Sequence, residues 1–271
     1  MTTAIVTDST TSLRHGSRDR PDLRVVPLTF HFGPEETYTD KVDMSNEEFY
    51  KRLAAAEDFP TTSQPPAGAF VEAYESLEAY DDVLVLTLSR ELSGTYDSAV
   101  AAAEIVDRPV EVRDTRSAEM GSGLILEEAL RVADGGGAFN DVLQGAERAI
   151  QGCEAFFAVG TLEYLAKSGR IGRAQRLVGT ALNIRPVLRI QDGVVVPHKR
   201  ARGRNRQMAA VAEQVKPVVE DGRRLYFGHV AAPELLKEFC EMLGVEDPTV
   251  AEIGGVVGAH VGPGAYGVAY L

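Results

Sequence analysis

The chain has 271 residues and a formal net charge of −12 at neutral pH. Hydrophobic residues make up 44% of it and charged residues 25%, ordinary proportions for a globular protein that exclude collagen-like, fibrous and intrinsically disordered chains. A chain of this length can bury a large core in one large domain or two smaller ones. An evenly spread acidic charge would repel nucleic acids and anionic membranes, so binding of an anion requires a local basic region.

The cysteines and the uncharged segments indicate the compartment. Cys153 and Cys240 belong to no CxxC motif or Cys/His cluster, so we expect two reduced thiols rather than one long-range disulfide. No basic segment followed by a long apolar run opens the chain, so no signal peptide is expected. The uncharged residues 253–271 include six glycines and Pro263, which disfavours a membrane helix. We expect a cytoplasmic protein with at most transient membrane contact.

Short apolar runs alternate with helical patterns along the chain, a rhythm typical of an α/β fold. The first helical pattern covers residues 45–55, where Ser45 and Glu48 form a capping box, and a second carries Phe70, Tyr74 and Leu77. We expect two α/β subdomains, residues 1–150 and 151–271, with a soft boundary. The runs expected to form strands are residues 4–6, 83–88, 110–112, 156–159, 187–190, 194–196 and 225–230.

Three segments rich in neutral hydrogen-bonding groups adjoin these elements. TDST at residues 7–10 follows the first strand, where ligands gather in parallel sheets, but a helix cap or a turn also explains these residues and is the favoured interpretation. The proline-framed residues 60–66 predict a loop that either caps a helix or holds a carboxylate or phosphate oxygen. Ser93 lies in the turn between strand 83–88 and the next helix, a typical anion pocket. Ser93 could instead be a nucleophile, but the GxSxG elbow is missing.

A glycine-rich segment at residues 258–267 contains a literal GxGxxG pattern. Only four residues follow this pattern, too few for the helix of a dinucleotide-binding unit. We therefore expect a loop that lets the backbone approach a ligand, with His260 beside it in either a structural or a functional role. Neither a Walker A motif nor a metal-ligand spacing occurs, so no cofactor or metal is expected.

The charge is segregated along the chain. Residues 160–206 carry a net charge of +9, and the remaining residues carry −21. This favours a phosphate-bearing ligand or an acidic partner protein. Nucleic acid is the alternative, but Tyr164 is the only aromatic residue in the segment that could stack on a base. The basic side chains are Lys167, Arg170, Arg173, Arg176, Arg185, Arg189, Lys199, Arg200, Arg202, Arg204 and Arg206.

Seven motifs, taken in this order, resemble the DegV family, whose members include the fatty-acid-binding subunits of bacterial fatty acid kinase. Each motif alone is weak, but the ordered set is specific and covers essentially the whole chain. The motifs are TDST (7–10), TSQP (62–65), LSGTYDSA (92–99), TLEYLAKSGRIGR (161–173), LNIRPVL (182–188), KRARGR (199–204) and HVGPGAYG (260–267).

The resemblance implies a fold of two α/β subdomains, with an acyl pocket at their junction or within the C-terminal one. It implies a carrier rather than an enzyme, which binds one long-chain fatty acid and presents the carboxyl group to a separate ATP-dependent fatty acid kinase. The acyl phosphate would stay bound until an acyltransferase takes it. Burying about sixteen carbons is worth roughly 12 kcal/mol gross at about 0.8 kcal/mol per CH₂, so the tail can supply most of the affinity.

The resemblance also assigns the head-group residues. Thr62 and Ser93 would contact the carboxyl group, His260 would belong to the surrounding network, and Gly94 and Gly264 would allow close backbone approach. Neutral groups of this kind orient a carboxyl group without the tight hold that a buried arginine clamp would keep on the charged product.

The arginines of the basic segment receive two possible roles. Arg170 or Arg173 would steady the acyl phosphate at the site entrance, and Arg202 with its neighbours would dock an acidic kinase surface. Two other functions stay open as alternatives: a serine esterase or phosphotransferase that uses Ser93 and His260, and a nucleic-acid-binding regulator.

Overall fold

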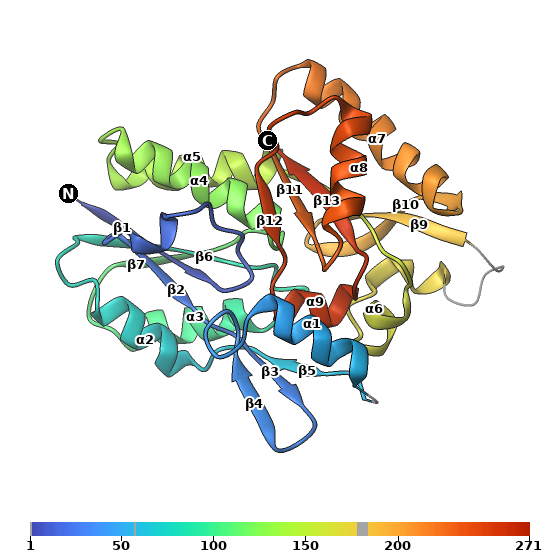
Figure 1. Ribbon diagram of the computed structural model, residues 1–271. Coiled ribbons are helices and arrows are strands. Elements are labelled where there is room, and N and C mark those ends of the chain that lie inside the picture. Colours follow the sequence, from blue (N-terminus) through green and yellow to red (C-terminus); the bar gives the residue numbers. More distant parts are fainter. Residues whose placement is uncertain (1, 57, 178–183) are drawn as a thin grey trace.

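The computed structural model describes residues 2–56, 58–177 and 184–271 (Figure 1). Leu182 and Asn183 of the LNIRPVL motif lie outside the described residues. The described residues form three sheets with helices packed on and between them, which confirms the predicted α/β class. Among the residues that the structure describes, no helix is long and apolar enough to cross a membrane.

The first sheet contains four parallel strands with helices on both faces. Val83 and Val85 point to one face, against α2 and α3, and Leu84 and Leu86 point to the other, against α4 and α5. Burial on both faces explains why this run is continuously apolar. In sheet order the strands are β2 (Leu23–Val26), β1 (Thr3–Asp8), β6 (Asp82–Thr87) and β7 (Val110–Asp114). The helices are α2 (Ala67–Glu75), α3 (Thr95–Ala103), α4 (Met120–Asp134) and α5 (Phe139–Gly152).

A small antiparallel sheet contains β4 (Glu36–Thr39), β3 (Thr29–Phe32) and β5 (Thr61–Ser63). The expectation of a loop at residues 60–66 is therefore wrong for its centre, because Thr62 pairs with Phe30 of β3. This pairing joins segments far apart in the sequence and leaves no local pattern. Helix α1 (Asn46–Ala55) packs on this sheet through Phe49, and the Ser45 side chain caps it by accepting the Glu48 N–H, which is one of the two hydrogen bonds of the predicted capping box.

The third sheet has six strands, all from residues after 150. Its outer face packs on α7 (Arg204–Glu220) and α8 (Pro233–Leu243) around Phe239, and its inner face points to the N-terminal half. In sheet order the strands are β10 (Val194–Arg202), β9 (Ile184–Gln191), β8 (Glu154–Ala158), β13 (Tyr266–Tyr270), β11 (Leu225–His229) and β12 (Val250–Glu252). Every run expected to form a strand lies largely within a strand.

The C-terminal glycine-rich segment forms a helix and the start of a strand where a loop was predicted. Helix α9 (Gly255–Val261) contains His260, and β13 follows after a short turn and runs between β8 and β11. A Cβ at Gly267 would lie 2.7 Å from the Phe156 carbonyl oxygen, so glycine allows β13 to fit against β8. The glycines here serve strand packing as well as a turn.

The two halves of the chain pack closely together. Helix α4 contacts β1 and β6 of the first sheet as well as β11 and β13 of the third. Helix α9 packs against α1, β3 and β5 of the N-terminal half and against α6 (Glu163–Lys167) (Figure 1). The boundary near residue 150 stays a prediction, although the first and third sheets share no strand across it. Two short 3₁₀ helices, η1 (Ser17–Asp19) and η2 (Gly172–Leu177), complete the described elements.

Candidate ligand-binding site

A cavity of about 340 Å³ lies where the two halves meet. Its C-terminal wall is the inner face of the six-stranded sheet, where Val195, Ile190 and Ala155 form one row because they are in register across β10, β9 and β8. Its N-terminal wall comes from β5 and from the loops that precede α3 and α4. Most of the lining is apolar, including Leu28, Leu88, Leu92, Met120, Phe157, Leu165, Ile253 and Val256. Such a lining suits an apolar ligand.

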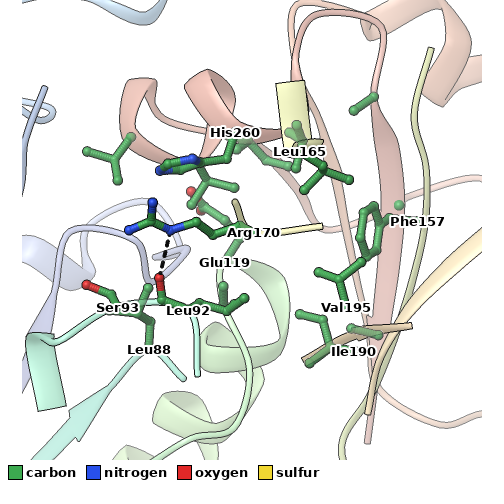
Figure 2. Close-up of a pocket in the computed structure, with 18 of the residues that line it drawn as sticks. Leu88, Leu92, Ser93, Glu119, Phe157, Leu165, Arg170, Ile190, Val195 and His260 are labelled. Carbon is green, nitrogen blue, oxygen red and sulfur yellow. Dashed lines mark hydrogen bonds between the residues drawn. The ribbon is translucent and has the colours of Figure 1, made fainter. Parts of the chain in front are cut away.

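Four of the predicted site residues line this one cavity: Thr62, Ser93, Arg170 and His260. They come from β5, the turn before α3, the turn after α6, and α9. In Figure 2, Ser93, Arg170 and His260 lie toward one side of the cavity and Phe157, Val195 and Ile190 toward the other. The fold thus brings polar side chains from four distant segments to one part of a mainly apolar cavity.

Ser93 is held by the start of α3. After β6 the chain turns through hydrogen bonds from the Leu92 and Ser93 N–H groups to the Ser89 carbonyl, and the helix begins after Gly94. Ser93 Oγ lies 2.9 Å from Thr95 Oγ1 and accepts the Thr95 N–H at 3.3 Å. A nucleophilic serine needs a hydrogen-bonded base. Among the described residues, no such bond joins Ser93 to His260.

His260 is the centre of the polar end. Its Nε2 lies 2.8 Å from Thr62 Oγ1, and its Nδ1 is buried without a hydrogen-bond partner among the described residues. Burial, together with a smaller effect of the nearby positive charge of Arg170, lowers the pKa of His260 to about 4. The imidazole is therefore neutral near pH 7, and it can offer a hydrogen bond but no charge.

Arg170 adds the positive charge of the polar end. Its Nε donates to the Leu92 carbonyl at 3.2 Å, and its Nη1 donates to the Ser168 carbonyl at 2.7 Å. Figure 2 shows the first of these bonds and the guanidinium group on the same side of the cavity as Ser93 and His260. The two carbonyls hold this side chain across the gap between the α3 and α6 turns.

The two predicted glycines shape the site without lining the cavity. A Cβ at Gly94 would lie 2.1 Å from Oε1 of Gln64, which does line the cavity and whose Nε2 donates to Ser98 at 2.9 Å. Gly264 has φ +81° in the turn between α9 and β13, and its N–H donates to the Val230 carbonyl. The residue after it, Ala265, lines the cavity.

The other two predicted arginines lie outside the cavity. Arg173 is exposed on η2, and Arg202 is exposed at the end of β10. Neither forms an ion pair within the part of the chain that the structure describes, whereas Lys199 pairs with Glu213. The structure thus separates Arg170 from Arg173 and Arg202.

The TDST segment is structural. The Asp8 carboxylate accepts hydrogen bonds from the Thr10 N–H and hydroxyl at 2.9 and 2.6 Å, and from the Leu88 N–H at 2.7 Å. These bonds tie the end of β1 to the loop after β6, the loop that carries Ser93. The side chain of Asp8 is completely buried and lies outside the cavity lining. Of the two interpretations of this segment, the geometry supports the turn.

Glu119, which precedes α4 and lines the cavity, is not among the residues predicted from the sequence. Only 3% of this residue is exposed. Its backbone has φ 47°, a conformation that residues other than glycine seldom adopt. Burial raises the pKa of its carboxyl group to about 7, and the charge of Lys41 and the hydroxyl of Ser12 oppose the rise. One glutamate before an apolar helix resembles an ordinary first-turn acid, so the sequence carried little signal.

The two cysteines and the potential metal ligands were also compared with the predictions. Cys153 and Cys240 are free thiols, as predicted, and burial raises the pKa of Cys153 to about 12 and that of Cys240 to about 11. Across the described residues, no group of three His, Cys, Asp or Glu side chains is arranged to hold a metal ion.

With this geometry in view, comparison with known proteins decides the family. A family model described as "uncharacterised protein, DegV family" matches residues 2–271. The chain belongs to the DegV family. A DegV domain-containing protein of Streptomyces coelicolor is 35% identical over 98% of this chain and 96% of that protein.

Several solved structures share the fold over the full chain. A DegV family protein from Thermus thermophilus, described by its fatty acid binding, superimposes with a TM-score of 0.90 at 35% identity, covering 100% of this chain and 99% of the other. DegV of Bacillus subtilis, described as a fatty acid binding protein, superimposes with a TM-score of 0.88 at 29% identity, covering 100% of this chain and 99% of the other. A stearic acid-binding protein from Eubacterium ventriosum gives 0.89 at 27% identity, covering 100% and 98%.

Proposed function

We propose that this protein binds one long-chain fatty acid in the cavity between its two halves, with the carboxyl group toward Thr62, Ser93 and His260. The observation that carries the proposal is the combination of a mainly apolar wall with neutral hydrogen-bonding groups gathered in one part of it. Each buried CH₂ contributes about 0.8 kcal/mol, so the wall supplies affinity and the polar part supplies orientation. Relatives described as fatty acid binding proteins support the same ligand class.

The polar part suits a carboxyl group that must react while bound. Hydroxyl groups donate and accept hydrogen bonds, so Thr62 and Ser93 fit a carboxylate and an acyl phosphate alike. Because His260 is neutral near pH 7, Arg170 is the only full positive charge among the residues that line the described cavity. One charge orients the head group without the hold of a multiple-arginine clamp.

The proposal extends to the protein's partners. A separate ATP-dependent fatty acid kinase transfers a phosphoryl group to the bound carboxylate in the cytoplasm, and an acyltransferase then takes the acyl phosphate for phospholipid synthesis. The protein itself acts as a carrier with no catalytic residue, cofactor or metal. Arg173 and Arg202 are exposed and free of ion pairs within the described residues, so they can meet an acidic surface of the kinase.

Mass spectrometry of an organic extract of the purified protein tests the ligand class. We expect one equivalent of a long-chain fatty acid in the wild type and much less in a Leu165→Glu variant, which places a charge in the apolar wall. Phe239→Leu alters the opposite face of the third sheet and serves as the control, with retained ligand. Absence of fatty acid from repeated wild-type preparations, together with no binding of added fatty acid, would overturn the proposal.

A further inference from the structure

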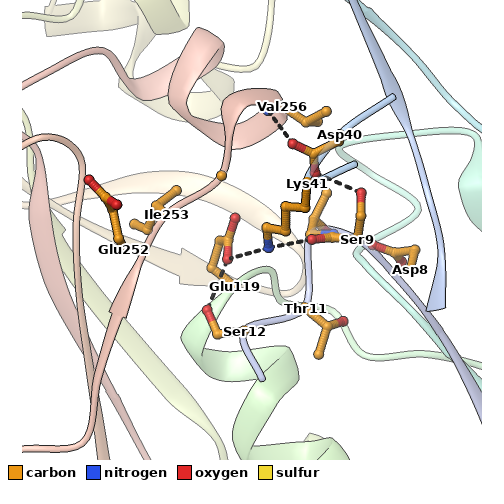
Figure 3. A network of polar contacts seen from close by, with 12 residues as sticks. Asp8, Ser9, Thr11, Ser12, Asp40, Lys41, Glu119, Glu252, Ile253 and Val256 are labelled. Carbon is orange, nitrogen blue, oxygen red and sulfur yellow. Dashed lines mark hydrogen bonds and ion pairs between the residues drawn. The ribbon is translucent and has the colours of Figure 1, made fainter. Parts of the chain in front are cut away.

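Helix α9, which carries His260, is held at its first turn by a polar network from the N-terminal half (Figure 3). Asp40 accepts hydrogen bonds from the Val256 N–H at 3.4 Å and from Ser9 Oγ at 2.7 Å. Asp40 and Ser9 are both buried, so the network fastens the first turn of α9 to the loop after β1. His260 lies about one turn further along this helix, where the network does not reach.

The hydrogen bonds of the His260 ring do not by themselves fix the last turn of α9. Nε2 lies 2.8 Å from Thr62 Oγ1, and Nδ1 has no hydrogen-bond partner among the described residues. The ring can reach Thr62 only if the helix backbone is held at the right distance. Gly262 and Gly264 follow with φ +77° and +81°, and glycine backbones restrict this turn little. Packing must therefore hold the last turn in place.

A tyrosine from α6 packs on this last turn. A Cβ at Gly262 would lie 2.3–2.7 Å from Cδ2, Cε2 and Cγ of Tyr164, so the ring lies directly against the glycine backbone. The Gly262 N–H donates to the Gly258 carbonyl at 2.8 Å and closes the helical turn that contains His260. Tyr164 is not part of the cavity lining, so it influences the site only through the residues that it contacts.

The ring of Tyr164 also contacts the N-terminal half. Its centroid lies 4.8 Å from that of Phe59, in an edge-to-face arrangement with an interplanar angle of 62°. Phe59 lies two positions before β5, the strand that carries Thr62. An aromatic pair of this geometry is stabilising beyond the area that it buries. Tyr164 therefore joins the two segments whose Thr62 and His260 side chains share a hydrogen bond.

We propose that Tyr164 is a positioning residue of the head-group site: by packing between Gly262 and Phe59, it holds His260 at hydrogen-bonding distance from Thr62. This inference rests on the proposed function, in which Thr62 and His260 receive the carboxyl group of the fatty acid. The absence of a Cβ at Gly262 makes room for the ring, and the ring fills that room. A branched aliphatic side chain would leave part of it empty, and the turn would be free to shift.

A double-mutant cycle, measured by displacement of a fluorescent fatty acid, tests the inference. Tyr164→Leu keeps an apolar side chain but removes the ring. We expect it to bind fatty acid about tenfold more weakly than the wild type, the ratio that follows from one lost hydrogen bond in the site. In a His260→Ala background the same substitution should change the affinity by less than about twofold, because the group that it positions is absent. Tyr164→Phe keeps the ring and should bind like the wild type.

Tyr80→Leu is the matched control: Tyr80 is half-buried like Tyr164 but precedes β6 outside the cavity lining, and this variant should keep the wild-type affinity. Phe59→Leu is a milder change that carries the same test if Tyr164→Leu fails to fold. It should weaken binding about threefold, again only when His260 is present.

A Tyr164→Leu effect of equal size with and without His260 would overturn this inference alone, because it would show that the tyrosine does not act through His260. Unchanged affinity in both Tyr164→Leu and Phe59→Leu would overturn it as well. Wild-type protein that binds no fatty acid would instead overturn the proposed function on which the inference rests.

Discussion

Thr62 Oγ1 and His260 Nε2 lie 2.8 Å apart although 198 positions separate the two residues in the sequence. Thr62 is placed by the pairing of β5 with β3, and His260 by the packing of α9 against those same strands. The hydrogen bond between them therefore closes the polar end of the cavity only when both halves are folded together.

This hydrogen bond predicts the effect of Thr62→Val, which keeps the shape and removes the hydroxyl group. The variant leaves His260 Nε2 buried without its partner and removes a hydrogen-bonding group from the proposed head-group site. We expect fatty acid affinity to fall about tenfold, measured by displacement of a fluorescent fatty acid. Thr249→Val, outside the cavity lining, is the control; an equal fall there would remove the assignment of Thr62.

The lowered pKa of His260 predicts a pH dependence of stability. The pKa of this histidine is about 4 in the folded state and near 6.5 in the unfolded state, so the folded state binds the proton less tightly. The contribution of neutral His260 to the free energy of unfolding is therefore fully present above pH 6.5 and is lost as the pH falls toward about 4. His260→Gln removes the titration. In urea unfolding between pH 4 and pH 7, the wild type should lose on the order of 2–3 kcal/mol more than the variant. Parallel pH profiles would show that His260 is not buried as described.

The raised pKa of Glu119 predicts the opposite dependence of stability on pH, in an overlapping pH range. Its pKa is raised from 4.5 to about 7, so the folded state binds this proton more tightly, and the contribution is present below pH 4.5 and is lost as the pH rises to about 7. Glu119→Gln should therefore gain stability relative to the wild type over that interval, by on the order of 2–3 kcal/mol. The same urea series measures it, and a constant difference between the two proteins would contradict the raised pKa.

Elements with a local signal were predictable from the sequence. Residues 83–86 are apolar without interruption because both faces of their strand are buried, and Ser45 caps α1 by accepting the N–H of Glu48, only three residues away. Strands β5 and β13 carried no such signal. Strand β5 is placed by its pairing with β3, and β13 by its pairing with β8 and β11. In addition, β13 contains Gly267, where any side chain would collide with Phe156.

The residues of the site also differ in whether the sequence alone could predict them. Hydroxyl-rich turns before helices indicated Thr62 and Ser93, and the glycine-rich segment drew attention to His260. Glu119 was missed because its significance comes from burial and from a positive φ, neither of which a single sequence displays. The basic segment was recognised as a unit, but only the fold separates Arg170 in the cavity wall from Arg173 and Arg202 on the surface.

Gly94 offers a test of how the α3 turn shapes the cavity. In Gly94→Ala the new Cβ would overlap the Gln64 amide, which must then give up its hydrogen bond to Ser98. We expect a loss of about 1 kcal/mol in unfolding free energy and weaker fatty acid binding, because Gln64 lines the cavity. Gly68→Ala is the matched control: it lies in α2 with open space around it and should stabilise the protein by up to about 1 kcal/mol. Equal stability and affinity in both variants would contradict the described contact.

The surface arginines give the prediction that separates binding from partner docking. Arg173→Ala and Arg202→Ala each remove an exposed charge outside the cavity, so the amount of bound fatty acid should stay at the wild-type level. If these residues meet an acidic kinase surface, the rate of acyl phosphate formation with the cognate kinase should fall about tenfold, and the difference from the wild type should shrink as salt screens the charges. Arg18→Ala, exposed on η1, is the control and should leave the rate unchanged. Loss of lipid binding in either variant, in step with the loss of phosphorylation, would place that arginine in the ligand site instead.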